Sequence, residues 1–281
     1  MPFPVPGRIA EMLRRCTVQI RSGAARQTEG TGSGIALNDG RILTNVHVIA
    51  GSEVTVEAWD GASQRAQVAK TDRHHDLALL VVEKLDVPAA TFASNEAKPG
   101  QAVIAVGNPL GFIGAVSTGF IQRVGIVRGL GGRRWVQADL RLAPGNSGGP
   151  LADVHGEVIG VNTMVAGGLA LSIPANAVQT FLSEGWRRRE LGVVIREVML
   201  PSQRPALMIL EVKRNGPAES ASLLPGDLLV RAGERPLTSA DDLYEVLSSA
   251  ETLHLSFLRG GNTTERRVTV QLAPSLVETA A

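Results

Sequence analysis

The sequence is poor in cysteine. Cys16 is the only one in 281 residues, so no disulfide can form within the chain, and nothing in this composition indicates an oxidising compartment. The residue lies in the apolar run 16–20, where a cysteine most simply acts as a small buried hydrophobic side chain. A fold held together by internal disulfides is therefore excluded.

Long apolar runs are also missing. No stretch reaches the roughly 18 apolar residues that a membrane-spanning helix needs, so no membrane span is predicted. The first 15 residues contain three prolines and an early acid without an apolar block, unlike a secretory signal peptide. The sequence alone therefore predicts a soluble protein in the cytoplasm.

A strong charge of either sign is absent as well. The net charge is +1 and the isoelectric point is about 8.0, so the composition gives no case for nucleic acid or an anionic membrane as a partner. One dense basic cluster interrupts this balance, and it is better explained as the solvated end of a helix than as a nucleic-acid patch. The cluster comprises Arg187, Arg188 and Arg189.

What the chain does have is length and a regular β-type pattern. With 281 residues and 44% hydrophobic content it exceeds the usual size of one core, which predicts two domains. From residue 16 to about residue 175, short apolar runs alternate with Gly, Asn, Asp and Pro, and no helix intervenes. This spacing predicts an antiparallel barrel or sandwich. The clearest runs are 34–37, 54–59, 77–82, 102–106, 119–124, 135–140 and 158–162.

Helices are predicted only later in the chain. The first is expected to start at Asn176 as its N-cap and to run into the three arginines. A second pattern begins after Leu191 and includes a helix at 240–249. A capping box precedes that helix, with Ser239 as the N-cap and Asp242 as the N3 carboxylate. Strands of this second pattern are predicted near 193–198, 207–213 and 252–258.

The chemistry of the first domain centres on Ser147, which is set between glycines in the segment 145–150 (GNSGGP). A serine hydroxyl needs a base to remove its proton and donors to stabilise the oxyanion. His47 is a candidate base where an apolar strand breaks into a turn, and Asp76 stands at the start of the apolar run 77–82. Taken singly, each also fits an ordinary role: a glycine turn, a core histidine and a strand-entry turn.

The three candidates occur in the chain order His, Asp, Ser, which is one of three orders in which Ser-His-Asp triads are found. The segments around them resemble the chymotrypsin-fold serine peptidases and, within these, the HtrA/Deg family. The matching segments are TNVHV at 44–48, HHDLALL at 74–80, APGNSGGPL at 143–151, GSGIAL at 32–37, GNPLG at 107–111 and IGVNT at 159–163.

This resemblance implies a mainly β fold, in which two six-stranded antiparallel β-barrels are followed by a C-terminal α+β PDZ domain. It places an N-terminal segment at 1–15, a trypsin-like protease domain at 16–188, a PDZ domain at 189–275 and a tail at 276–281. A homotrimer is also implied, which Phe3 and the short amphipathic stretch 9–13 support weakly. No cofactor and no metal are expected.

The resemblance implies roles for individual residues too. Ser147 is the expected nucleophile, His47 the base that takes and returns its proton, and Asp76 the acid that fixes the imidazole tautomer. The backbone N–H groups of Gly145 and Ser147 are expected to form the oxyanion hole. An apolar S1 pocket for small or medium aliphatic P1 side chains is expected from Leu142, Leu169 and Leu171.

One departure from the family pattern concerns Arg141, which stands where a small residue is usual. An arginine turned to solvent is the simpler interpretation, because burying an unpaired guanidinium is costly. An arginine in the pocket would instead favour acidic P1 side chains. Glycine-rich turns are candidate regulatory segments, and they lie at 109–117, 126–134 and 163–168.

Two other kinds of site deserve comparison. GNSGG also fits the nucleophile elbow of α/β-hydrolases, but Pro150 and the strand-like run 158–161 follow the serine where that fold needs a helix. That fold also needs its histidine after the serine, and only His155 and His254 lie there. A metal site at residues 74–75, which are both histidines, lacks a third ligand at suitable spacing.

The C-terminal part resembles a PDZ domain of the HtrA type, through ELGV at 190–193, GPAESA at 216–221 and LPGDLL at 224–229. Leu191, Gly192 and Val193 match the loop whose N–H groups bind a terminal carboxylate, and the following strand would pair with the peptide. The helix at 240–249 would form the other wall. A departure from the family pattern at 232–236 predicts a shifted or bulged strand just before it.

These features together predict a cofactor-independent serine endopeptidase that degrades unfolded or damaged polypeptides and binds peptide C-termini. Nucleic acid is not an expected partner. The alternative is a peptide-binding or chaperone module whose protease domain rests in an inactive loop arrangement.

Overall fold

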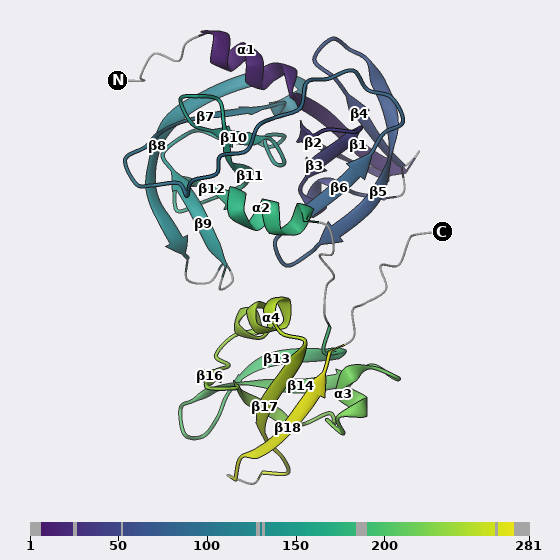
Figure 1. Cartoon of the computed structure of the whole chain (residues 1–281), viewed down its shortest axis with the longest axis vertical. Helices are drawn as coiled ribbons and strands as arrows, with labels where there is room; N and C mark the ends of the chain where they lie inside the picture. The colour runs from purple at the N-terminus through teal and green to yellow at the C-terminus, as the bar shows by residue number, and fades with distance from the viewer. Residues whose placement is uncertain are drawn as a thin grey trace. The chain divides into compact units, whose positions relative to one another are not determined.

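The computed structural model (Figure 1) divides into two compact units, the first containing two β-barrels and the second a single sheet with helices. The structure describes residues 7–24, 27–51, 53–127, 130, 133–183, 190–261 and 264–272. The arginine cluster at 187–189 and Phe3 lie outside these residues.

The first barrel is closed and antiparallel, and its strand order is β1-β2-β3-β6-β5-β4. Alternation of buried and more exposed side chains explains its strands: in β4, Val54 and Val56 point into the barrel core between two glutamates. The same core contains Val18, Ile20 and Leu80. The strands are β1 (Thr17–Ala24), β2 (Gln27–Ala36), β3 (Arg41–Thr44), β4 (Glu53–Glu57), β5 (Ser63–Asp72) and β6 (Leu77–Val81).

The second barrel repeats this architecture, with the order β10-β11-β12-β9-β8-β7. Val103, Val136 and Leu151 belong to its core. The predicted pair of six-stranded antiparallel barrels is therefore confirmed. The strands are β7 (Ala102–Gly107), β8 (Ala115–Ile126), β9 (Arg134–Ala138), β10 (Pro150–Ala152), β11 (Val158–Ala166) and β12 (Leu169–Pro174).

Helix α1 (Gly7–Arg15) packs against the second barrel of its own chain. Leu13 and Cys16 are buried there against Ile104 and Val106, so the amphipathic stretch 9–13 has an intramolecular role. Burial raises the pKa of the Cys16 thiol to about 11, which confirms the expected small buried side chain and keeps the thiol protonated at neutral pH.

Helix α2 (Ala175–Leu182) follows β12 directly. The prediction that Asn176 is its N-cap is wrong, because Pro174 occupies that position with an extended backbone and Asn176 lies inside the first turn. The Asn176 Oδ1 accepts only a local bond from the N–H of Ala177, at 2.8 Å. The helix ends at Leu182, and the predicted continuation into the arginines falls outside the described residues.

The second unit is an α+β sheet with the order β13-β14-β15-β17-β18, to which β16 adds beside β15. The predicted capping box is confirmed, since Ser239 accepts from the Asp242 N–H and Asp242 accepts from the Ser239 N–H. The predicted irregularity before 232–236 is present as a register shift between Leu229 and Arg231. The elements are β13 (Val193–Met199), β14 (Pro205–Val212), α3 (Pro217–Ser220), β15 (Leu228–Ala232), β16 (Arg235–Pro236), α4 (Ala240–Ser249), β17 (Thr252–Leu258) and β18 (Arg266–Gln271).

Candidate active site

His47 and Asp76 meet at one end of the first barrel. His47 lies in the 3-10 turn η1 (Val46–Val48) just after β3, and Asp76 stands immediately before β6, the strand that pairs with β3. The Nδ1 atom of His47 is 2.6 Å from Oδ2 of Asp76, and the backbone N–H of His47 donates to Oδ1 at 3.0 Å. The carboxylate thus holds both the ring and the backbone of the histidine.

Asp76 adopts a left-handed backbone with φ of +56°, a conformation that Asp and Asn tolerate better than most side chains. Its carboxylate is largely buried, whereas the His47 side chain is half exposed. An exposed ring beside a buried acid suits proton exchange with a substrate, because the acid remains shielded while the imidazole stays accessible.

A second histidine–aspartate pair precedes this one in the same turn. Asp72 is buried, and its carboxylate accepts from Nδ1 of His75 at 2.7 Å and from the N–H groups of His74 and His75. Burial alone raises the pKa of Asp72, but hydrogen bonds and charge from His75 outweigh it, so the pKa lies below its ordinary value. Within the described residues, no group of three or more His, Cys, Asp or Glu side chains could hold a metal ion.

Ser147 lies in the loop between β9 and β10, against the first barrel. Gly145 has φ of +102°, and a Cβ there would lie 2.6 Å from the Asn108 carbonyl oxygen. Gly148 has φ of +86°, and a Cβ there would lie 2.1 Å from the carbonyl oxygen of Ser33. Both positions therefore need glycine, for backbone angle and for space.

The Ser147 hydroxyl donates to the carbonyl oxygen of Thr163 at 2.9 Å. In the part of the chain that the structure describes, no hydrogen bond joins Ser147 to His47. A shared network nevertheless connects their loops: the side-chain amide of Asn45 donates to the Asp76 carbonyl at 2.8 Å and to the Thr163 hydroxyl at 3.3 Å. Rotation about χ1 of Ser147 would break the hydrogen bond to the Thr163 carbonyl and let the Ser147 hydroxyl donate to another acceptor.

The N–H groups of Gly145 and Ser147 have no acceptor among the described residues. The Pro144 carbonyl, which belongs to the same peptide unit as the Gly145 N–H, accepts from the Leu110 N–H at 3.2 Å. Because C=O and N–H point in opposite directions across a trans peptide, this bond turns the Gly145 N–H away from the Leu110 loop. Two free donors in one loop are what an oxyanion hole requires.

The residues expected to line S1 differ in exposure. Leu171 is buried at 1% exposure, Leu169 is half-buried, and Leu142 packs against the core of the second barrel. Arg141 is exposed, and its backbone N–H donates to the Ser117 hydroxyl at 3.1 Å. Its exposure agrees with the simpler interpretation, an arginine turned to solvent.

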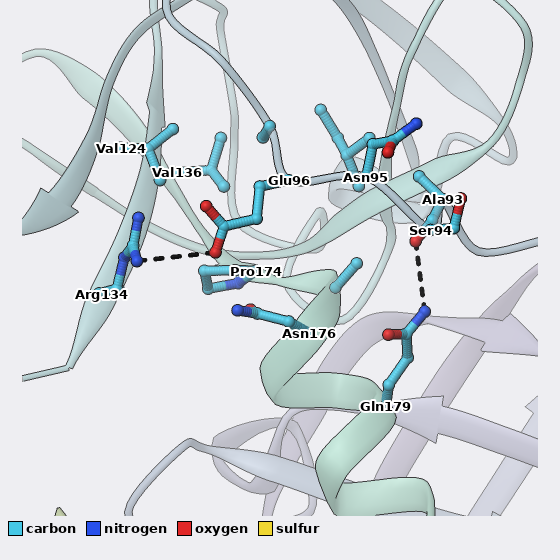
Figure 2. A pocket seen from close by; sticks show the side chains of 13 residues that line it. Ala93, Ser94, Asn95, Glu96, Val124, Arg134, Val136, Pro174, Asn176 and Gln179 are labelled. Carbon is cyan, nitrogen blue, oxygen red and sulfur yellow. Dashed lines mark hydrogen bonds and ion pairs between the residues drawn. The ribbon is translucent and has the colours of Figure 1, made fainter.

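A small hollow on the second barrel contains none of the predicted site residues. Figure 2 shows it between the segment 93–97, strands β8 and β9, and the start of α2. Gln179 donates to the Ala93 carbonyl at 3.2 Å, and Arg134 lies 3.6 Å from Glu96 in an exposed ion pair. These contacts join the segment 93–97 to the second barrel, and the residues that line the hollow include no histidine that could activate the Ser94 hydroxyl.

The second unit has a groove between β13 and α4. Strand β13 pairs with β14 alone and leaves its other edge open within the described residues. The N–H groups of Leu191 and Gly192 have no acceptor there, while the carbonyls of the same residues are held by Ala218 and Lys213. The predicted carboxylate loop and helix wall therefore do lie together. The groove is lined by Glu190, Leu191, Gly192, Val193, Ile195, Leu243, Tyr244 and Leu247.

Comparison with known proteins agrees with this geometry. A family described as "Trypsin-like peptidase domain" matches residues 32–161, and one described as "PDZ domain" matches residues 189–270. A "Probable periplasmic serine endoprotease DegP-like" of Pseudomonas savastanoi pv. phaseolicola is 34% identical over 89% of this chain and 57% of its own length. The chain belongs to the HtrA/Deg family of serine peptidases. The predicted family resemblance is thereby confirmed.

Other relatives extend the HtrA comparison. "Putative serine protease HhoB" of Synechocystis is 34% identical over 83% of this chain and 64% of its own length. A solved structure described as "HtrA-type protease AlgW with tripeptide" is 26% identical, with a TM-score of 0.71 over 97% of this chain and 99% of that one. The chain thus spans between 57% and 64% of the length of these two curated relatives.

The expectation of a cytoplasmic location is wrong. Two Pseudomonas relatives of this HtrA-family chain are named periplasmic serine endoproteases. The expectation had rested on the composition of the first 15 residues and on a single cysteine, neither of which determines a compartment. As to membranes, no helix in the described ranges combines the length and the apolar character needed to cross one.

Three positions that touch the triad loops were missed as individual residues by the sequence analysis. They are polar side chains buried at 0–2% exposure where apolar residues would be expected: Ser33, Asn45 and Thr163. That anomaly was the available signal, because a buried polar group needs a specific partner. Their partners lie up to 118 positions away in the chain, as for Asn45 and Thr163, so the sequence could not identify them.

Proposed function

We propose that this chain is a serine endopeptidase of the HtrA type, which cleaves unfolded or damaged polypeptides and binds peptide C-termini through its PDZ domain. The observation that carries the proposal is the contact of 2.6 Å between His47 Nδ1 and Asp76 Oδ2, with the same carboxylate also accepting from the His47 backbone. A homotrimer in the periplasm completes the proposal, on the family resemblance and on the names of the Pseudomonas relatives.

In the proposed mechanism, Asp76 accepts a hydrogen bond from the Nδ1–H of His47 and so leaves Nε2 as the free base. Ser147 rotates from its Thr163 acceptor towards that nitrogen, loses its proton to it and attacks the scissile carbonyl. The N–H groups of Gly145 and Ser147 stabilise the oxyanion, and His47 returns the proton to the leaving amine. An acyl-enzyme on Ser147 is then hydrolysed by water through the same base.

Substrate selection in this proposal comes from both domains. Leu142, Leu169 and Leu171 would favour an aliphatic P1 side chain. No acid occurs among these positions to attract a basic P1 residue, and in this proposal the exposed Arg141 faces solvent. The alternative of a binding module with a resting protease domain is not favoured, because the relatives in the comparisons are named as serine proteases or serine endoproteases.

A fluorophosphonate probe tests the nucleophile directly. We expect treatment of the purified chain to place one covalent adduct on Ser147, because the probe needs an activated serine and free oxyanion donors. The adduct is located by peptide mass spectrometry after digestion. An adduct on another serine, or no adduct under conditions where casein is digested, would contradict the assignment.

The affinity of the groove between β13 and α4 for a peptide is expected to depend on a free C-terminal carboxylate. A peptide of about ten residues ending in valine should bind at least about tenfold more tightly than its C-terminally amidated form, because a charge-assisted hydrogen bond is worth roughly 1.5–3 kcal/mol. The carboxylate would accept from the free N–H groups of Leu191 and Gly192.

Isothermal titration calorimetry with the Ser147→Ala chain measures this difference without cleavage of the peptide. The amidated peptide is the matched control, since both peptides offer the same side chains and the same strand for pairing. Equal affinities of the two peptides would show that the loop at 190–193 does not bind the terminal carboxylate.

A further inference from the structure

Ser33 of the first barrel contacts the nucleophile loop of the second barrel with two of its three polar atoms, the hydroxyl oxygen and the backbone nitrogen. Its hydroxyl donates to the Gly145 carbonyl at 2.6 Å and accepts from the Asn108 N–H at 2.8 Å. Its backbone N–H donates to the Ser147 carbonyl at 2.8 Å. Its own carbonyl accepts from the Thr44 hydroxyl at 2.7 Å, which anchors Ser33 to strand β3.

These contacts fall on the two residues whose N–H groups are free. Ser33 fixes the carbonyl of Gly145 through its hydroxyl and the carbonyl of Ser147 through its N–H. Fixing a residue's carbonyl restricts its ψ angle. This matters most at Gly145, which has the widest conformational freedom of the loop.

The Asn108 contact extends the same restraint to the other side of Gly145. Asn108 begins the turn that leads to Leu110, and the Leu110 N–H holds the Pro144 carbonyl. The Ser33 hydroxyl therefore bridges the Gly145 carbonyl and the turn that orients the Gly145 N–H. The Ser33 hydroxyl thus restrains the peptide units on both sides of Gly145.

We propose that Ser33 is a positioning residue, whose hydroxyl keeps the donors of Gly145 and Ser147 aimed at the oxyanion. This inference rests on the proposed peptidase function and extends it to a residue of the other barrel. Ser33 has 0% exposure and Asn108 has 1%, so loss of the hydroxyl leaves a buried N–H and a buried carbonyl without a partner. The loop can then satisfy these two groups only by moving out of the arrangement in which the N–H groups of Gly145 and Ser147 face the oxyanion.

The test is the steady-state kinetics of Ser33→Ala on a chromogenic peptide substrate. Loss of a single oxyanion donor typically lowers kcat by about 10²–10³. A donor that is present but misdirected should lose only part of this effect. We therefore expect kcat to fall about 10- to 100-fold, with KM within about threefold of the parent value. Thr17→Val is the matched control, because Thr17 is equally buried and donates to the Leu13 carbonyl at 2.7 Å, outside the loop network. It should keep its kcat.

Ser33→Cys separates hydrogen bonding from packing. A thiol is larger than a hydroxyl and a weaker donor, so a hydrogen-bonding role predicts kcat in the order Ser, Cys, Ala. A pure packing role predicts that the larger cysteine is the most damaging. This variant also serves if Ser33→Ala does not fold. An unchanged kcat in the alanine variant, or cysteine as the worst variant, would overturn the proposal.

Amide hydrogen exchange gives a readout that does not depend on activity. In Ser33→Ala the Asn108 N–H loses its acceptor, and we expect it to exchange at least about tenfold faster than in the parent, with global stability measured alongside. Exchange that is unchanged, or that rises only as global stability falls, overturns the positioning role. If the parent hydrolyses no peptide, the proposed function fails, while the exchange of Asn108 still decides the role of Ser33.

Discussion

Ser147→Ala is expected to abolish proteolysis, with kcat on a denatured protein substrate falling about a millionfold, as in other triad enzymes that lose the nucleophile. The side chain removed is the hydroxyl that donates to Thr163, and nothing else in the loop can form the acyl intermediate. Ser147 is half-buried, so the variant should fold normally. Digestion of casein followed over time measures the loss.

Ser94→Ala is the control for this substitution, because Ser94 is exposed and lies outside the nucleophile loop. It should digest casein at the parent rate. Comparing the parent chain with Ser147→Ala addresses the binding-module alternative. A parent chain that suppresses client aggregation as well as Ser147→Ala does, without digesting the client, would contradict peptidase function. A residual activity above about one part in a thousand would indicate another nucleophile.

The strands that sequence analysis predicted are those whose apolar content is decisive. The runs 54–59 and 77–82 became β4 and β6, because their side chains fill the first barrel core. Strand β5 was not predicted. Its side chains are mostly exposed and show no apolar period, and it exists because β4 and β6 offer backbone partners on both sides.

The N-cap prediction for helix α2 failed because a neighbouring residue already has the backbone conformation of the cap. Asn176 has a typical N-cap side chain, yet Pro174, with φ of −63° and ψ of 148°, already adopts the extended backbone of the cap position two residues earlier. The capping box at Ser239 was predictable, because both of its partners lie within four residues. Short-range patterns were thus reliable when no proline competed with them.

At the site, the sequence could not predict the polar contacts between residues that lie far apart in the chain. His47 and Asp76 could be paired from the order of motifs, and the structure joins them at 2.6 Å. The role of Ser33 could not be foreseen, because it depends on how two barrels face each other across the nucleophile loop. A serine between glycines in a strand shows only that space is tight. The partner has to be found in three dimensions.

Asp76→Asn is expected to lower kcat about ten-thousandfold while leaving the fold intact. Asparagine tolerates the left-handed backbone at this position as well as aspartate does. Because the His47 N–H donates to Oδ1, the amide oxygen of the variant should take that place and the NH₂ group should face Nδ1. Nδ1 then becomes an acceptor, and the imidazole proton moves to Nε2. The base that Ser147 needs is lost through the tautomer alone.

Asp153→Asn is the matched control for Asp76→Asn. Asp153 is similarly buried and its Oδ1 accepts from the N–H groups of His155 and Glu157 in a hairpin turn of the second barrel. Both variants lose one carboxylate charge from a turn, but only Asp76 contacts His47. Peptide hydrolysis gives kcat, and nitrogen chemical shifts of the His47 ring give the tautomer. A normal kcat in Asp76→Asn, or a lost kcat with Nδ1 still protonated, would contradict the orienting role, because the geometry links activity to the nitrogen that carries the proton.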